Sequence, residues 1–367
     1  MRKLLPVATA LVLVIGIAGV PAAAQEGGAS GEPIVIPEQF VSPEALTADT
    51  PVDATPFARE APWKLCVSAG YLFNSWVVFA LQNIRYQASL EPNYEPDIVV
   101  TDAAFDANKQ VSDISDLINQ GCEAIIYWPV DDKAVEPGLE QAVAAGIPTV
   151  NVGGGYADLP GIVSNAHIDQ YELGVAVALE LAESLGGQGK IVSMLPIAGT
   201  TAAVNQDLAL RQVLEGYPDI EILDTKNGDW NRAQAKSITE NWLLQFPEID
   251  GVFSPAGQMS VGMAEAFDEA GRLGEVTFSP GDEYNGWLKW IAAHPESNGG
   301  VVTFPPSAGA VGVQQMTRIL NGEEVTKGIA VPSVWYAPED AAALAEPDAP
   351  DDWWASDLPP EFLPQAQ

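Results

Sequence analysis

The chain is poor in the residue types that bind nucleic acid or hold metal ions. Its 367 residues contain only 16 Lys and Arg against 50 Asp and Glu, and the formal net charge is −34. Such an acidic surface repels phosphate backbones, so nucleic acid is excluded as a partner. With only two His and two Cys, we expect no metal site, and no motif indicates a cofactor. We attribute the acidity to surface adaptation for solubility.

Long apolar runs are equally scarce. Residues 11–20 form one short run, which follows Arg2 and Lys3 and precedes Ala22-Ala23-Ala24. This order predicts a secretory signal peptide over residues 1–24 rather than a membrane anchor, which needs about 20 apolar residues. No second such run follows, and no cysteine stands near the cleavage point. We therefore expect a secreted, periplasmic protein without membrane insertion or a lipid anchor.

The remaining chain alternates regularly between strand and helix patterns. Buried-type strands are predicted at 64–70, 97–101, 123–128 and 147–151, and helices at 75–90, 108–120 and 135–145. The alternation restarts after His167 and continues to residue 320. This pattern predicts the α/β class, with two similar doubly wound parallel-sheet lobes and an interlobe cleft. Ligands of such sheets bind beyond the carboxyl ends of the strands, so residues just after each strand are the site candidates.

The two cysteines, Cys66 and Cys122, lie near the beginnings of two predicted strands. These strands are neighbours in a flavodoxin-like strand order, and the periplasm permits disulfides. A bridge needs Cα atoms roughly 4.4–6.8 Å apart, which the sequence does not determine. A disulfide and two buried thiols both stay open.

Several segments over residues 65–334 stand out in this body: KQVSDISDLINQG, AIIYWPVD, AVAAGIPTV, NGDWNRAQAKSITENWLLQFPEIDGVFSPAGQMSVGMAEAF and MTRILNGEEV. In this order they resemble the ribose-type periplasmic sugar-binding proteins of ABC importers. The resemblance implies the type I periplasmic binding protein fold, with chain crossings near residues 165–168, 300–304 and 329–333.

The implied division of the chain has five parts. Residues 1–24 are the signal peptide and 25–61 a Pro-rich arm lying on the surface or partly disordered. The first lobe takes 62–167 plus 304–328, and the second takes 168–303 plus 329–340. Residues 341–367 form an acidic tail rich in Trp and Pro. Because an exposed Trp353-Trp354 pair would be costly, we expect the tail to pack back on the body.

The resemblance also implies a ligand clamp between aromatic walls. Asn74 and Trp76 match the first-loop positions that bond and stack on the ligand, and Trp230 matches the aromatic wall of the second lobe. Asp282 matches the acid that takes ligand hydroxyls. The full set of expected ligand-binding residues is Asn74, Trp76, Asn151, Gly153, Gln206, Trp230, Gln258, Asp282, Tyr284 and Thr303.

The chain departs from the family where charged groups usually stand. Gly153-Gly154, Gln206 and Ala256-Gly257 replace an Asp-Arg pair, an Arg and an Asn-Asp pair. A buried hydroxyl left unpaired costs roughly 1–3 kcal/mol, so ribose is not expected. Either Asn151, Gln258 and Tyr284 take over these bonds, or the ligand is less hydroxylated. The small residues would also leave room for a larger solute.

The sequence offers no catalytic arrangement. The Gly-rich residues 186–190 resemble a phosphate loop, but Ile191 stands where Ser or Thr would bind magnesium. His167 and His294 suggest no nucleophile–His–acid trio. We therefore expect a monomeric importer component that captures a small neutral sugar or polyol and partners a membrane permease. Alternatives are a binding protein for a less polar or aromatic solute and a receptor feeding a membrane sensor. A repressor or a hydrolase is less consistent with the signal peptide and the missing motifs.

Overall fold

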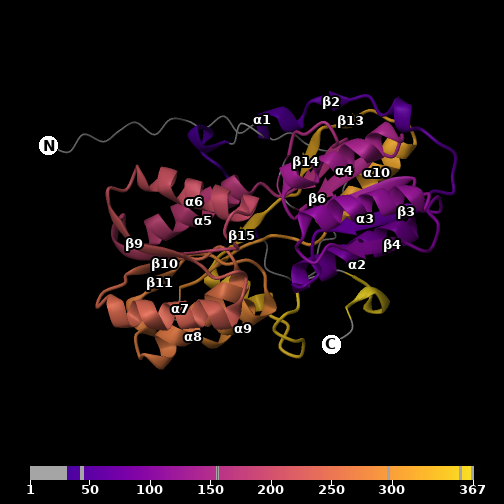
Figure 1. The fold of residues 1–367 in the computed structure, drawn as a ribbon. Helices are drawn as coiled ribbons and strands as arrows, with labels where there is room; N and C mark the ends of the chain where they lie inside the picture. The colour runs from indigo at the N-terminus through magenta and orange to yellow at the C-terminus, as the bar shows by residue number, and fades with distance from the viewer. Residues whose placement is uncertain are drawn as a thin grey trace.

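The computed structural model describes residues 31–41, 45–153, 155, 157–295, 298–354 and 358–364. Two α/β lobes lie side by side, the first on the right of Figure 1 and the second on the left. Each is built on its own parallel sheet, so the predicted fold class is confirmed. The predicted signal peptide, residues 1–24, lies outside the described residues.

The first lobe contains a six-stranded parallel sheet. In spatial order its strands are β14 (Gly328–Ala330), β7 (Ser164–His167), β6 (Thr149–Val152), β5 (Ala124–Trp128), β3 (Leu65–Ala69) and β4 (Val99–Asp102). The helices that cover it are α2 (Ser75–Leu90), α3 (Ala107–Asn119), α4 (Asp132–Ala144) and α10 (Ala308–Leu320). Along β5, Ile125 and Tyr127 pack in the core with α3 and α4, whereas Ile126 and Trp128 pack in the core with α2 and α10. The strand is apolar throughout because both of its faces are covered.

The second lobe contains a four-stranded parallel sheet. In spatial order its strands are β11 (Thr277–Phe278), β10 (Gly251–Phe253), β8 (Gln188–Leu195) and β9 (Asp219–Asn227). Its helices are α5 (Gln170–Ser184), α6 (Thr201–Leu214), α7 (Arg232–Gln245), α8 (Gly257–Glu269) and α9 (Asn285–Ala293). The pair α5 and α6 packs with one core, and the pair α7 and α8 with another.

Side-chain caps set where several of these helices begin. Asn74, Asp131, Thr200 and Asn231 each accept a backbone N–H from the first turn of α2, α4, α6 and α7, respectively. Each cap satisfies a donor that has no partner inside the helix. Because every capped helix follows a parallel strand, these helix N-termini lie at the carboxyl ends of the two sheets.

The chain passes between the lobes between β7 and α5, between β12 (Val301–Val302) and α10, and between β14 and β15 (Val334–Tyr336). β14 extends the first lobe's sheet to Ala330, past the boundary expected at residue 328. β7 was not predicted, because its residues Ser-Asn-Ala-His lack an apolar pattern. Its Asn165 is buried with partners, since Nδ2 donates to the carbonyls of Ala157 and Lys327 at 3.1 and 2.9 Å.

The N-terminal arm contributes short strands to both lobes. β1 (Glu32–Pro33) pairs antiparallel with β15, and β2 (Pro51–Val52) pairs with β13 (Val325–Thr326). The described residues of the arm are therefore attached to the body. The remaining short elements are η1 (Glu38–Phe40), α1 (Ala45–Ala48), η2 (Thr55–Phe57), η3 (Leu273–Glu275), α11 (Pro338–Ala343) and η5 (Pro360–Phe362). No helix in the described ranges is long and apolar enough to cross a membrane.

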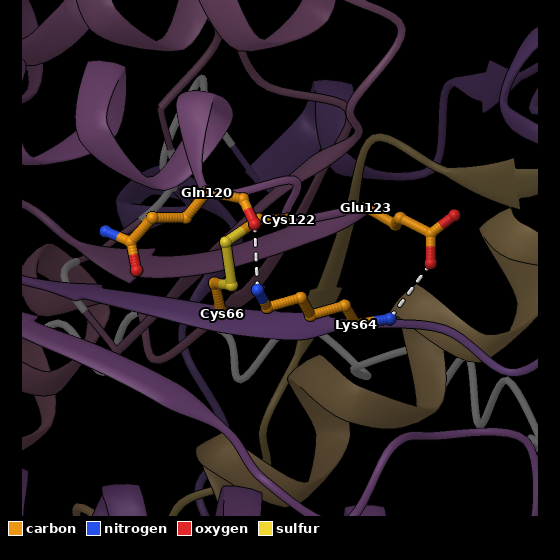
Figure 2. Close-up of a disulfide and its surroundings, with 5 residues drawn as sticks. All are labelled: Lys64, Cys66, Gln120, Cys122 and Glu123. Atoms are coloured by element: carbon orange, nitrogen blue, oxygen red, sulfur yellow. Dashed lines mark hydrogen bonds between the residues drawn. A yellow bond between two sulfur atoms is a disulfide. The ribbon is translucent and has the colours of Figure 1, made fainter.

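Cys66 and Cys122 form a disulfide, with Cα atoms 5.9 Å apart (Figure 2). Cys66 lies in β3 and Cys122 just before β5, and these two strands pair in the sheet. Beside the bridge, the Nζ of Lys64 donates to the carbonyl of Gln120 at 2.8 Å. The backbone N–H of Lys64 donates to the carboxylate of Glu123 at 3.0 Å. The register between β3 and β5 thus decides the question that the sequence left open.

Candidate ligand-binding site

A cavity of about 100 Å³ lies between the lobes. One water occupies about 10–15 Å³ by the same measure, so the cavity has room for a small solute. From the first lobe it is lined by Tyr71, Asn74, Trp76, Pro129, Val130, Asp131, Asp132 and Gly153. From the second lobe it is lined by Gln170, Leu173, Thr200, Thr201, Ala202, Gln206, Trp230, Pro255, Ala256, Gln258 and Asp282. Phe304 from a crossing segment and Trp354 from the tail complete the wall.

Most of the residues predicted for the site line this cavity. They are Asn74, Trp76, Gly153, Gln206, Trp230, Gln258 and Asp282. Most of them follow the carboxyl end of a strand, or lie in the first turn or two of the helix after it. The parallel sheets bring these segments together from distant parts of the chain.

The structure places the other predicted residues, Asn151, Thr303 and Tyr284, outside the lining. The amide of Asn151 donates to Asn165 and to the carbonyl of Gly155, both at 3.1 Å, and so holds a loop of the first lobe. The hydroxyl of Thr303 accepts the N–H of Val334 at 2.9 Å and joins two crossing segments. Tyr284 is buried against Trp354 instead. Thr303 and Tyr284 follow strands and Asn151 lies within β6, but the sequence could not show which way their side chains point.

Trp76 is held by the segments around it. Its Nε1 donates to the carbonyl of Phe304 at 2.7 Å, and its ring lies against Gly153. The expectation that small residues leave room for a larger solute is therefore wrong at this position, because the Trp76 ring fills the space. The space beside Gly257 is also occupied, since a Cβ there would lie 2.8 Å from the carboxylate of Asp282.

Trp230 faces the first lobe from the loop after β9. Its ring lies near that of Tyr71, with centroids 6.4 Å apart and planes at 29°. The backbone of Trp230 has φ of +50°, a conformation that non-glycine residues seldom adopt. Strain of this kind persists where the surrounding structure enforces it, as at binding sites. The ring is thus aimed across the cleft.

Asp282 places a buried carboxyl group on the second-lobe side of the cavity. Its Oδ1 accepts the N–H of Gly257 at 2.9 Å and the N–H of Tyr284 at 3.3 Å. Burial nevertheless raises the pKa of Asp282 to about 7. The neighbouring Glu283 accepts the N–H of Phe304 at 2.6 Å, and burial together with the charge of Asp282 raises the pKa of Glu283 to about 8.

Further polar groups in the cavity wall are hydrogen-bond acceptors. Thr201 reaches across the cleft to Asp132, whose other carboxylate oxygen is buried and has no partner among the described residues. Burial raises the pKa of Asp132 to about 6. Gln206 donates to Gln170 at 2.9 Å, and its own side-chain oxygen, also buried, finds no partner in the part of the chain that the structure describes. A ligand that donates hydrogen bonds would satisfy these oxygens.

Tyr71, Phe304 and Trp354 belong to the wall but were not predicted. Tyr71 and Phe304 follow strands closely, so their positions carried a usable signal. Trp354 comes from the tail beyond the last predicted strand, and no sequence pattern connected it with the cleft. The described lining contains no Lys, Arg, His or Cys, and no cluster able to hold a metal occurs in the described chain. Aromatic faces and oxygen acceptors suit binding rather than catalysis.

Comparison with known proteins identifies the family to which the chain belongs. The model of the periplasmic binding protein domain matches residues 67–324. The chain is 34% identical over 179 residues to the xylitol-binding protein of Mycolicibacterium smegmatis, covering 48% of this chain and 51% of that one. It thus spans about half the length of that relative. It is 26% identical over 235 residues to the ribose import binding protein RbsB of Bacillus subtilis, covering 64% and 75%, respectively.

The fold is shared with solved solute-binding proteins. One is the ABC transporter solute-binding protein of Bacillus halodurans with bound myo-inositol, which matches with a TM-score of 0.69 and 21% identity. The match covers 77% of this chain and 97% of that protein. The chain therefore belongs to the periplasmic binding protein domain family and is a substrate-binding protein with the type I fold, not an enzyme.

Proposed function

We propose that this protein is the periplasmic substrate-binding component of an ABC importer and that it captures a sugar or polyol between its lobes. The main support for this proposal is the interlobe cavity. Its wall contains the aromatic rings of Trp76 and Trp230 and the buried carboxyl group of Asp282. Relatives that bind xylitol, ribose and myo-inositol support this ligand class.

The chemistry of the wall fits such a solute. The C–H faces of a ring pack on aromatic side chains, and its hydroxyls donate to carboxylate and amide oxygens. Asp282, Asp132 and Gln206 provide such oxygens from both lobes. A ring that bonds to both lobes at once stabilises the closed arrangement.

Closure would also allow a membrane permease to recognise the ligand-bound protein. The lobes are joined by crossing segments, which allow a hinge motion around the ligand. A closed pair of lobes presents a surface that the open pair does not, so ligand occupancy and permease recognition form one equilibrium. We expect the protein to act as a monomer, which light scattering behind gel filtration tests.

A less polar or aromatic solute is the second candidate. It is favoured by the absence of Lys, Arg and His from the described lining and by the rings of Tyr71 and Phe304. Such a ligand would leave the oxygens of Asp132 and Gln206 unpaired, which costs about 1–3 kcal/mol for each group. We therefore rank it second.

Calorimetric titration with a small panel tests the proposal. The panel contains myo-inositol, xylitol and D-ribose, with phenol and cyclohexanol as the less polar arm. We expect myo-inositol or xylitol to bind, and D-ribose to bind weakly because the usual charged groups are missing. Trp76→Ala should weaken binding by about 1–3 kcal/mol if stacking resembles that on other aromatic platforms. Leu244→Ala, at a side chain 88% exposed, is the control. Binding of phenol alone would favour the second candidate.

A further inference from the structure

The C-terminal segment contacts both lobes and contributes Trp354 to the cavity wall. We define the C-terminal strap as residues 346–354 and 358–363, which lie beyond the family match ending at residue 324. In Figure 1 the yellow segment passes between α9 of the second lobe and α2 of the first. We infer that this strap closes the cleft and that its Trp354 contacts the ligand and selects for it. The inference rests on the proposal that the interlobe cavity is the ligand site.

Polar bonds attach the strap to the second lobe. Asn285, at the start of α9, donates from Nδ2 to the carbonyl of Glu346 and accepts the N–H of Glu346 at Oδ1, both at 2.9 Å. Asp351 forms ion pairs with Arg232 at 2.8 Å and with Lys289 at 3.3 Å. Several bonds, some of them charge-assisted, therefore hold the strap to α7 and α9.

Fewer contacts join the same part of the strap to the first lobe. Trp354 donates from Nε1 to the hydroxyl of Ser75 at 2.8 Å. The ring of Trp353 meets that of Phe79 edge-on, with centroids 5.1 Å apart. Both partners lie on α2. Within residues 346–354, the contacts that the described structure gives to the first lobe are one neutral hydrogen bond and one ring contact.

Trp354 is at once a strap residue and a cavity residue. Its side chain is only 2% exposed and forms part of the cavity wall. Ser75, which accepts its N–H, stands between the lining residues Asn74 and Trp76. The hydrogen bond therefore ties the strap to the rim of the site, where it completes an aromatic wall from outside the two lobes.

Lobe opening must separate α2 from α9, so one set of strap contacts has to break. The contacts with Ser75 and Phe79 are fewer and uncharged, so Trp354 leaves with the second lobe and returns on closure. Farther along, Phe362 packs on Tyr86 of α2 with centroids 5.1 Å apart. The strap is thus attached to both lobes and limits how far they separate. When the lobes close, the indole face of Trp354 packs against the ligand. It therefore favours a solute that presents C–H groups toward Trp354.

The test combines Trp354→Phe, Ser75→Ala and the double variant, with Trp290→Phe as the matched control. Trp290 lies on α9, away from the cavity, and stacks on His294. The affinity for myo-inositol and for xylitol is measured by calorimetry. We expect each single variant at positions 354 and 75 to weaken binding about threefold to tenfold, the range of one neutral hydrogen bond. The double variant should be no weaker than Trp354→Phe, because both changes remove the same bond.

Small-angle scattering of the ligand-free proteins supplies the second measurement. Loss of the Trp354–Ser75 bond should raise the radius of gyration above that of wild type and of Trp290→Phe. Unchanged affinity together with an unchanged radius in Trp354→Phe would overturn the inference, as would additive effects in the double variant. If wild type binds neither polyol, the proposed ligand class fails, and the ligand-free scattering still decides whether the strap holds the lobes together.

Discussion

Trp76 and Gly153 share a space that only a glycine leaves free. A Cβ at position 153 would lie 2.1 Å from Cη2 of Trp76, far inside van der Waals contact. Gly153 also has φ of +71°, which other residues seldom adopt. Trp76 in turn donates to the carbonyl of Phe304 on a crossing segment. The loop after β6 thereby sets the position of an aromatic wall of the cavity and of a contact with the hinge.

We expect Gly153→Ala to weaken ligand binding at least tenfold and to destabilise the fold by more than about 2 kcal/mol. The strained backbone contributes about 1–2 kcal/mol and the displaced ring a further 1–3 kcal/mol. Gly121→Ala is the matched control, because Gly121 has φ of +78° with nothing near its Cβ. It should show the backbone cost alone and bind normally. Urea unfolding and calorimetry measure both quantities; equal effects of the two changes would contradict the role given to Gly153.

Ligand affinity should depend on pH through Asp282, whose pKa burial raises to about 7. A hydroxyl donates best to the ionised carboxylate, so affinity for a polyol should fall as pH drops below about 7. The decline approaches tenfold per pH unit once the acid is protonated. Calorimetry between pH 5.5 and 8.5 follows it. Asp282→Asn should bind more weakly at pH 8.5 and lose the part of the decline centred near pH 7, leaving only the part near pH 6 that comes from Asp132. A flat wild-type profile would contradict this assignment.

Folding stability should decrease with rising pH through Glu283. Burial and the nearby Asp282 raise its pKa to about 8 from an ordinary value of 4.5. The folded protein therefore keeps a proton that the unfolded chain releases between about pH 4.5 and 8. Stability from this group is present at the acidic end of that window and is lost as pH approaches 8. Thermal unfolding of wild type should show a steeper decline from pH 5 to 8 than that of Glu283→Gln. Parallel curves would exclude Glu283 as the source.

The disulfide should add measurable stability without affecting the site. Cys66 and Cys122 are 56 residues apart in sequence and lie at the amino ends of β3 and β5, and neither lines the cavity. Replacing both by alanine should lower the free energy of unfolding by about 2–4 kcal/mol. Guanidinium unfolding measures the loss, and calorimetry should return the wild-type affinity. Addition of reductant should lower the stability of wild type but leave that of the double alanine variant unchanged.

The sequence alone was enough to predict the two lobes and the neighbourhood of the site. Apolar runs such as those of β3 and β5 predict buried parallel strands, because only a strand covered on both faces is apolar throughout. Once strands alternate with helices, their carboxyl ends must meet at one edge of each sheet. Asn74, Trp230 and Asp282 were predicted from the resemblance to sugar-binding proteins together with their places after strands, and Gln206 was predicted from its match to a family position on the following helix.

Only the tertiary structure decided what each of these positions does. Asn151 lies within β6 and Thr303 follows β12, yet both bond within the protein, because a side chain's direction depends on partners elsewhere in the chain. The pairing register of β3 and β5 brought Cys66 and Cys122 within bonding reach. Trp354 joined the cavity through its bond to Ser75, on a helix some 280 residues earlier in the chain. Local patterns determine the elements and their faces, whereas contacts between remote segments form only when the chain is folded.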